Sequence, residues 1–344
     1  MTRRRQARVT LADVARAARV SAMTVSNVLN DSGRVSEGTR DRVRSTVSRL
    51  GYVPNLSAAR LTGSSLSRVG VVYPAGSSAF VTTLIAAIAT EAASRGLQII
   101  FSPATIRDRA QAEMQTRDLI AAGAEGVALV SPFAELLKSQ TIRELDAPLA
   151  GLLAARPIEG MATVRIDNEA AAYAITTLLL DKGHDRIAVI TGPADHGDSP
   201  LRLAGHRAAL RARLLEKHPE LEVIGDFTFA SGVSGAERLM SVSPAPTAIV
   251  CANDETAAGV LWWLNKHGLR VPDEVAVCGF DDTQLATRVW PTLTTVKQPF
   301  PDMAAVALDA LATAFRARSR PSAMTDTVLP FALIERGSTC KDPT

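Results

Sequence analysis

The chain has 344 residues, of which 47% are hydrophobic, so its length and composition allow two or three hydrophobic cores of ordinary domain size. Its three cysteines, Cys251, Cys278 and Cys340, lie far apart, and without Cys/His ligand spacing they indicate neither a disulfide framework nor a zinc site. The formal net charge is +3, and it is unevenly distributed along the chain.

The first 62 residues are strongly basic. They hold twelve arginines, no lysine and four acidic residues, a net charge of +8. The rest of the chain carries 26 basic and 31 acidic residues, a net charge of −5. A solvated basic surface is one interpretation, but a basic segment attached to an acidic body is typical of a module that binds phosphate groups.

Residues 10–30 are predicted to form two short helices joined by a tight turn. Thr10 followed by Asp13 is a capping-box pattern, and Ser21 is placed to cap the second helix. The apolar residues that pack the two helices together are Leu11, Val14, Ala15, Val20, Val25, Val28 and Leu29. The outward positions of the second helix are Ala22, Met23, Ser26 and Asn27. An ordinary helical hairpin would show the same pattern, but the basic charge favours a helix-turn-helix that lies in a DNA groove.

The next segments define the predicted domain boundaries. A third helix is expected over residues 36–50, and Pro54 and its predecessor disfavour its continuation. Residues 55–62 allow only about two helical turns, which are marginal in isolation. We therefore predict a DNA-binding head over 1–54, a hinge helix and linker over 55–67, and a body over 68–344.

The body alternates short apolar runs with amphipathic helical segments. Strands are predicted at 69–73, 97–101, 126–130, 148–153, 186–191, 247–252 and 275–280. Helices are predicted, for example, at 84–95, 114–122, 169–182, 203–216 and 255–266. This alternation indicates parallel sheets covered by helices on both faces. The length favours two similar lobes with a cleft between them, where the ligand pocket is expected.

The chain shows no pattern typical of a membrane or secreted protein. The uncharged stretch 69–90 contains Pro74 and Gly76 and is interpreted as a buried strand followed by the start of a helix. The N-terminal residues lack the apolar run of a secretory signal. We expect a soluble cytoplasmic protein with no membrane partner.

An enzyme is the first alternative class. The sequence contains no GxGxxG, Walker or GxSxG motif, so no catalytic residue and no cofactor is predicted. His196 and Asp198 are too sparse for a metal site and are interpreted as part of a solvated loop.

The head and the body both resemble the lactose repressor (LacI/GalR) family of transcriptional regulators. In the head the resemblance lies in residues 10–15 (TLADVA), 20–26 (VSAMTVS), 35–40 (VSEGTR), 50–55 (LGYVPN) and Leu61. In the body it lies in residues 167–168 (DN), 183–187 (GHDRI), 202–205 (RLAG), 252–254 (AND), 271–282 (VPDEVAVCGFDD) and 291–299 (PTLTTVKQP). The ordered set covers nearly the whole chain.

The resemblance implies a small all-α helix-turn-helix head and an α/β two-lobed, periplasmic-binding-protein-like body. It also implies a homodimer that binds a near-palindromic double-stranded operator and is controlled by a small effector. Phosphate contacts are then expected from Thr24, Ser26, Asn30, Thr39 and Asn55. Base contacts are expected from Ala22, Met23 and Asn27, of which only the amide can pair bidentately, with adenine.

Leu61 corresponds to the hinge leucine of the family, which is wedged into the minor groove at the operator centre. Such apolar wedges kink the duplex, most easily at pyrimidine–purine steps. A leucine that only packs the linker against the body is the alternative. Many members have arginine two residues earlier, where this chain has Ala59.

By the same resemblance, the effector site is expected to contain Phe80, Arg202, Phe227, Asn253 and Asp281. These groups suit hydroxyl-rich or heterocyclic ligands, and a sugar-like effector is favoured. Arg202 and Asp281 could instead form a structural ion pair. Residues 75–79 depart from the polar pattern of many relatives, so the effector of a particular relative is not implied.

Two alternatives remain besides an enzyme. One is a solute-binding protein of sugar transport, which would have no use for residues 1–62 and would need a signal peptide. The other is a regulator that depends on a nucleoside-type co-repressor. For the favoured repressor we expect a two-state switch, in which lobe closure changes the spacing of the two linkers in the dimer.

Overall fold

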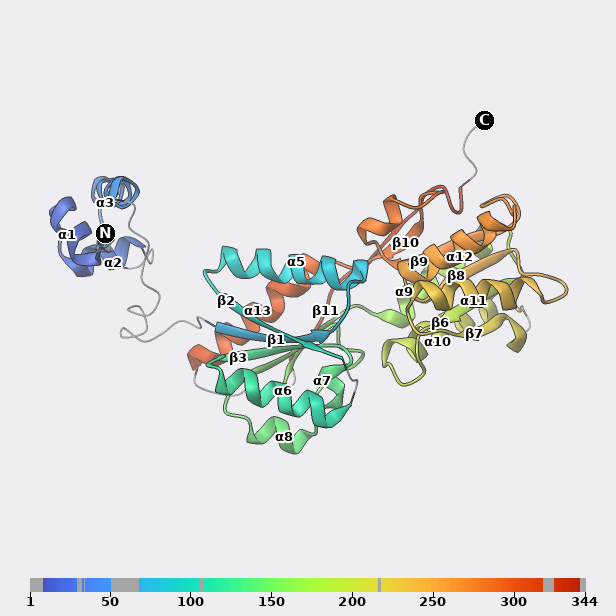
Figure 1. Cartoon of the computed structure of the whole chain (residues 1–344), viewed down its shortest axis with the longest axis horizontal. Coiled ribbons are helices and arrows are strands. Elements are labelled where there is room, and N and C mark those ends of the chain that lie inside the picture. Colours follow the sequence, from blue (N-terminus) through green and yellow to red (C-terminus); the bar gives the residue numbers. More distant parts are fainter. Residues whose placement is uncertain are drawn as a thin grey trace, which may run out of the picture. The chain divides into compact units, whose positions relative to one another are not determined.

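The structure is a computed structural model that describes residues 9–29, 33, 35–50, 68–105, 108–215, 218–317 and 325–340 (Figure 1). Contacts divide the chain into two compact units, Met1–Ser64 and Ser65–Thr344. The predicted hinge helix and linker, residues 55–67, lie outside the described residues. So do three of the predicted DNA-contact residues: Asn30, Asn55 and Leu61.

The described residues of the first unit form three short helices around a small apolar core. They are α1 (Leu11–Ala18), α2 (Ala22–Leu29) and α3 (Glu37–Leu50). The predicted capping box begins α1, since the amide of Asp13 donates to Thr10 Oγ1 at 3.3 Å and the amide of Thr10 donates to Asp13 Oδ2 at 3.0 Å. The amide of Thr24 donates to Ser21 Oγ at 3.1 Å at the start of α2. The core consists of Val14, Ala15, Ala18, Val25, Val28 and Val43.

The N lobe of the second unit is built on a parallel six-stranded sheet in the order β11-β5-β4-β3-β1-β2. Its strands are β1 (Arg68–Pro74), β2 (Gln98–Ala104), β3 (Gly126–Val130), β4 (Leu149–Leu152), β5 (Ala162–Arg165) and β11 (Thr325–Val328). Its helices are α5 (Ala79–Ser94), α6 (Arg109–Ala121), α7 (Phe133–Leu136), α8 (Ser139–Glu144) and α13 (Phe300–Ala317). Helices α5 and α13 cover one face of this sheet, and α6, α7 and α8 lie on the other (Figure 1).

The C lobe has a second six-stranded sheet, in the order β12-β10-β9-β8-β6-β7. Its strands are β6 (Ile187–Thr191), β7 (Glu222–Ile224), β8 (Ala248–Cys251), β9 (Ala276–Asp281), β10 (Thr294–Lys297) and β12 (Ala332–Ile334). Its helices are α9 (Asn168–Asp181), α10 (Asp198–Ala212), α11 (Phe229–Met240) and α12 (Asp254–Lys266), with short 3₁₀ turns at Pro219–Leu221 and Gln284–Thr287. Helices α9 and α10 pack together, as do α11 and α12.

The chain crosses between the lobes three times, at residues 165–168, 297–300 and 328–332. The N lobe therefore contains α13 and β11 from late in the sequence. The apolar side of α13 packs on the sheet through residues such as Met303, Leu308 and Leu311, which are at most 2% exposed. Three short connections are well suited to a hinge that preserves each lobe.

The predicted fold class is confirmed, with one departure in the sheets. The seven apolar runs coincide with seven of the observed strands, and the stretch 69–90 contains β1 and the start of α5. The exception to parallel pairing is β12, which runs antiparallel to β10 at the sheet edge. Strand β10 ends where the chain leaves the C lobe, whereas β12 begins where the third crossover enters it. The two strands therefore run in opposite directions.

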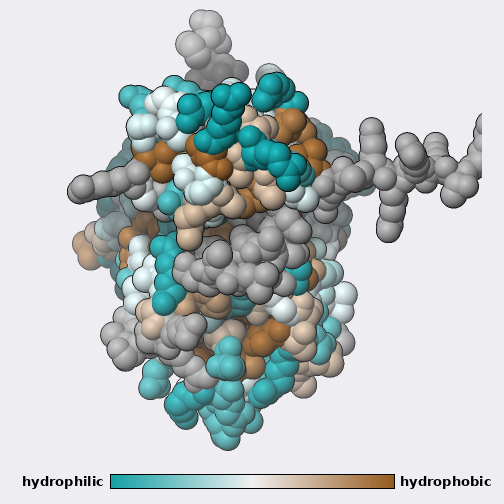
Figure 2. All heavy atoms as spheres, turned by 90° about the vertical axis from the view of Figure 1, so that its left-hand side faces the viewer, coloured by the Kyte–Doolittle hydropathy of each residue, from teal (hydrophilic) through white to brown (hydrophobic). Residues whose placement is uncertain are grey.

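Among the described residues, no helix is long and apolar enough to cross a membrane. On the face displayed in Figure 2, hydrophilic side chains are interspersed with small apolar areas.

Candidate functional site

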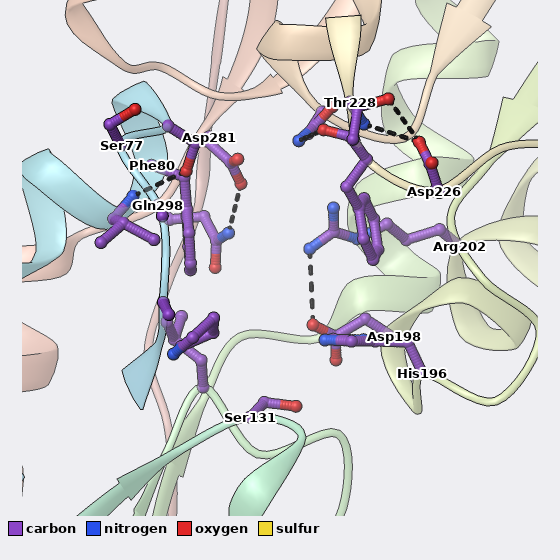
Figure 3. Close-up of a pocket in the computed structure, with 18 residues that line it drawn as sticks. Ser77, Phe80, Ser131, His196, Asp198, Arg202, Asp226, Thr228, Asp281 and Gln298 are labelled. Atoms are coloured by element: carbon purple, nitrogen blue, oxygen red, sulfur yellow. Dashed lines mark hydrogen bonds and ion pairs between the residues drawn. The ribbon is translucent and has the colours of Figure 1, made fainter. Parts of the chain in front are cut away.

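A cavity of about 300 Å³ lies between the two lobes. Its lining residues follow the carboxyl ends of strands from both sheets, as ligand sites in open α/β sheets do. Pro74 ends β1 and residues 75–78 follow it, Ser131 follows β3, and Asn253 follows β8. Figure 3 shows polar side chains from both walls pointing toward this space.

The structure brings all five predicted effector residues to this one cavity. They are Phe80, Arg202, Phe227, Asn253 and Asp281. Their shared location satisfies the geometric part of the prediction, while their role in binding stays a prediction.

Arg202 is fixed by protein groups. Its Nε donates to Asn168 Oδ1 at 2.8 Å, and its Nη1 donates to the carbonyl oxygen of Ala252. Its Nη2 lies 3.6 Å from Asp198 Oδ2, and its guanidinium carbon lies 3.6 Å from the centre of the Phe280 ring. The ion pair considered with Asp281 is therefore replaced by one with Asp198, on the same helix.

Asp281 combines burial with an unusual backbone conformation. It is 4% exposed, and it accepts a hydrogen bond from Gln298 Nε2 at 2.7 Å. Burial raises the pKa of its carboxyl well above the ordinary value, and Arg202 opposes that increase. Its φ of 112° is rare outside glycine, and Phe227 and Leu153 at the same cavity also have positive φ. Such strain concentrates at ligand sites.

Phe227 and Asn253 are joined by a hydrogen bond, and each is held by further contacts. The ring of Phe227 lies flat against Gly192, where an added Cβ would come within 2.1 Å of a ring carbon. His196 packs edge-on to this ring at 5.0 Å between centroids. Asn253 caps α12 by accepting from the amide of Thr256, and its Nδ2 donates to the carbonyl oxygen of Phe227 at 3.0 Å.

The interpretation of His196 and Asp198 as part of a solvated loop is wrong. Asp198 is 6% exposed, and both residues line the cavity. Burial is the main cause that raises the pKa of Asp198 to about 6. Sequence reasoning missed this residue and also Gln298. Asp198 precedes Arg202 by four positions, a spacing that pairs side chains on a helix, but the predicted helix 203–216 begins after both residues.

The head places the described DNA-contact candidates on α2 and α3. Ala22 and Met23 are exposed, Met23 by 70%. Thr24 and Thr39 are half-buried, and their hydroxyls lie 2.8 Å from Ser21 Oγ and 2.9 Å from Ser36 Oγ respectively. Ser26 and Asn27 are half-buried. The amide of Asn27 lies against Gly33, whose added Cβ would be 3.0 Å from Asn27 Nδ2.

The three helices of the first unit have the helix-turn-helix pattern, and the second unit is a two-lobed body with a cavity between its lobes. Together they define a ligand-responsive DNA-binding regulator. Two family models match the chain: bacterial regulatory proteins of the lacI family over residues 10–55, and a periplasmic binding protein-like domain over residues 176–339.

Relatives and solved structures agree with these matches. Catabolite control protein A of Priestia megaterium is 33% identical over 304 residues, which cover 87% of this chain and 90% of that protein. A lac repressor dimer bound to operator and the anti-inducer ONPF has a TM-score of 0.73 at 28% identity, covering 97% of this chain and 99% of that one. A complex of the regulator CelR with cellobiose has a TM-score of 0.70 at 30% identity, covering 96% and 100%. The chain belongs to the lacI family of bacterial regulatory proteins, and it is a DNA-binding transcriptional regulator.

Proposed function

We propose that this chain is a repressor that binds a near-palindromic operator as a homodimer and is controlled by a sugar-like effector in the cavity. The observation that carries the proposal is the cavity itself, in which an arginine, buried carboxyls and an aromatic ring converge at the carboxyl ends of two sheets. The solved lac repressor dimer on its operator and the complex of CelR with cellobiose support the same assignment.

For the head, we propose that polar side chains bind phosphates and that the first turn of α2 contacts base edges. Thr24, Ser26, Asn30, Thr39 and Asn55 would hold phosphates, because hydroxyls and amides suit phosphate oxygens. Ala22 and Met23 offer apolar contact, for example to a thymine methyl, and Asn27 offers an amide. Leu61 would be the minor-groove wedge, so much of the specificity would come from DNA deformation.

For the cavity, we propose that Phe80 and Phe227 contact the apolar faces of a hydroxyl-rich ligand and that Asp281 accepts its hydroxyl hydrogens. The guanidinium of Arg202 is held in place by Asn168 and Asp198, so it would meet the ligand without rearrangement. Asn253 would act mainly through Phe227, since both ends of its amide bond to the protein.

For the homodimer, we propose that a second copy covers exposed aromatic residues on the C lobe. Phe229 on α11 and Trp262 on α12 are 6.2 Å apart between ring centroids and are 38% and 46% exposed. Trp290 is 77% exposed, and its carbonyl oxygen accepts from Asn265 Nδ2, which ties its loop to α12. Large aromatic residues are enriched in protein interfaces.

The switch would then be a change in lobe closure that alters the spacing of the two linkers. To move such an equilibrium from 1:99 to 99:1, an effector must prefer one state by about 10⁴-fold, or roughly 5.5 kcal/mol. The chain would act in the cytoplasm, where the operator is, and it would have no catalytic activity.

The test is a gel-shift titration with DNA from upstream of the chain's own gene, repeated with a panel of sugars and nucleosides. We expect a specific shift that one class of sugar changes. Leu61→Ser should weaken operator binding and leave sugar affinity intact, because it removes only the wedge. Leu214→Ser is the matched control, since Leu214 is 93% exposed on the body. Without a specific shift under any condition, the repressor proposal fails. Unchanged operator affinity in Leu61→Ser would refute the wedge.

A further inference from the structure

The two lobes touch beside the cavity at Gly197 and Ala155. Ala155 follows β4 in the N lobe, and Gly197 immediately precedes α10 in the C lobe. A Cβ built on Gly197 would lie 2.5 Å from the Cβ of Ala155 and 3.9 Å from Glu135 Oε1. Interiors do not accommodate such an overlap without movement. The lack of a side chain at Gly197 is therefore what allows the lobes to approach this closely.

Glu135, on α7, supports the N-lobe side of this contact. Its Oε1 accepts from the amide of Ala155 at 2.8 Å and from Ser131 Oγ at 3.2 Å. Its Oε2 is buried and has no hydrogen-bond partner among the described residues. A buried oxygen without a partner is unfavourable, so this atom is suited to accept one more hydrogen bond.

Asp198 is the C-lobe carboxyl that directly follows Gly197, at the start of α10. Its side chain is 8% exposed, accepts from Asn168 Nδ2 at 3.2 Å, and lies 3.6 Å from Arg202 Nη2. The negative charge of Glu135 acts on it across the lobe boundary. The other charged or titratable groups around it are Arg202 on α10, Asp281 at the end of β9, and His196 in the loop before α10.

We propose that Glu135 and Asp198 form a proton-binding site between the lobes and that uptake of one proton closes the lobes over the cavity. The proton comes from solvent and resides on the Asp198 carboxyl, whose O–H then donates to Glu135 Oε2. When the proton is lost, two carboxylates face each other in a poorly solvated space. Their repulsion opens the contact at Gly197.

The sign of the pH dependence follows from the carboxyl of Asp198. In the closed lobes, burial first and then Glu135 raise its pKa from 3.8 to about 6. Opening exposes the carboxyl to water and lowers its pKa toward 3.8, so the closed form binds the proton more tightly. Closure is therefore favoured at low pH and weakened as the pH rises through about 6. With these two values, proton linkage gives a closed-to-open ratio about tenfold higher at about pH 5 than at about pH 7.5.

This inference deepens the proposed function, because it assigns a regulatory input to the same cavity. It concerns the lobes alone and is testable without effector or DNA. It can therefore fail while the repressor proposal stands, and a failure of operator binding would not affect it.

The experiment measures the distance between the lobes by pulsed electron spin resonance on the full chain. Spin labels are placed on Glu159→Cys in the N lobe and Leu214→Cys in the C lobe, both exposed positions, in a Cys340→Ser background. Labelled protein is diluted with unlabelled protein so that each assembly holds one labelled copy. We expect two distances, whose population ratio changes about tenfold between about pH 5 and about pH 7.5.

Four variants sharpen the test. Glu135→Gln and Asp198→Asn should each stay closed at both pH values, because an amide N–H replaces the proton. Gly197→Ala should stay open at both, because its Cβ meets Ala155. Glu144→Gln removes a half-exposed carboxylate from the same lobe and should behave as the unmodified chain. A distance distribution that is the same at both pH values, or an unchanged pH response in Glu135→Gln, would overturn the proposal.

Discussion

The two walls of the cavity differ in how firmly their side chains are held. The C-lobe wall contains Arg202, Asp198 and Asp281, each bonded to further protein groups, and the ring of Phe227 packed on Gly192. The N-lobe wall contributes residues 74–78, Phe80 and Ser131, which are apolar or carry only hydroxyls. Among the described lining residues, all charged groups come from the C lobe.

The difference separates two tasks that one cavity must perform. A pre-organised wall recognises a ligand with little reorganisation, because its side chains are already oriented. A wall whose side chains make few bonds to the rest of the protein can change its residues to suit a different ligand without loss of stability. We therefore expect substitutions on the C-lobe wall to alter stability as well as ligand response, and substitutions on the N-lobe wall to alter ligand response alone.

The largest effect is expected for Arg202→Ala. It leaves the carboxylate of Asp198 buried without its cation, and breaking a buried pair in this way typically destabilises by about 3–5 kcal/mol. Urea denaturation measures the loss, and effector titration should show no response. Arg213→Ala, which removes an exposed ion pair with Asp181, is the control and should change stability by less than about 0.5 kcal/mol. Equal losses for the two variants would contradict a pre-organised wall.

Gly192→Ala is expected to have the next largest effect. Its methyl group would displace the ring of Phe227, and such overpacking costs about 1–3 kcal/mol. Effector affinity should fall with stability, while operator affinity in the absence of effector stays unchanged. The double substitution with Phe227→Leu should recover most of the stability, as measured by thermal denaturation. If it recovers none, the ring is not what the methyl group displaces.

Asp281→Asn should alter the pH dependence of stability. Because burial raises the folded-state pKa of Asp281, the stability that its neutral form provides is present at low pH and lost as the pH rises. The amide does not titrate, so the variant does not lose this stability. Its free energy of unfolding should therefore rise relative to that of the parent chain by about 1 kcal/mol or more between about pH 5 and about pH 9, since each pKa unit is worth about 1.4 kcal/mol. Denaturation curves at both pH values measure this difference. A constant difference would show that Asp281 stays ionised.

The smallest effect on stability is expected for Ser77→Ala on the N-lobe wall. Ser77 is exposed at the cavity, so its substitution should change the free energy of unfolding by no more than about 0.5 kcal/mol. The change should appear only in effector affinity, measured by calorimetry. A loss of stability comparable to that of Gly192→Ala would remove the distinction between the two walls.

The strands of the body could be predicted where burial on both faces leaves a continuous apolar run. Residues 126–130 are the simplest case, and the predicted and observed strand coincide there. The short strands β5, β7, β10, β11 and β12 were not predicted, because three or four residues at or near a sheet edge carry no distinctive pattern. Their pairing depends on crossovers that no local signal reveals.

The cavity was only partly predictable for a related reason. The resemblance to a family placed Phe80, Arg202, Phe227, Asn253 and Asp281 at one site, and they lie there. The partner of Arg202 and the burial of Asp198 depend on how α10 meets Asn168 and the opposite lobe. Side-chain chemistry at one position does not contain that information. Only the tertiary contact distinguishes a solvated acid from a buried one.

The late position of α13 and β11 has a consequence for biosynthesis. Strands β1 to β5 leave the ribosome first, but one face of their sheet stays without its α13 cover until residues 300–317 have followed. The central strands of the C lobe, β6, β8 and β9, are all complete by residue 281. The N-lobe sheet is therefore synthesised before the C lobe but stays uncovered on one face until α13 follows, and this apolar face is the surface that needs protection during translation.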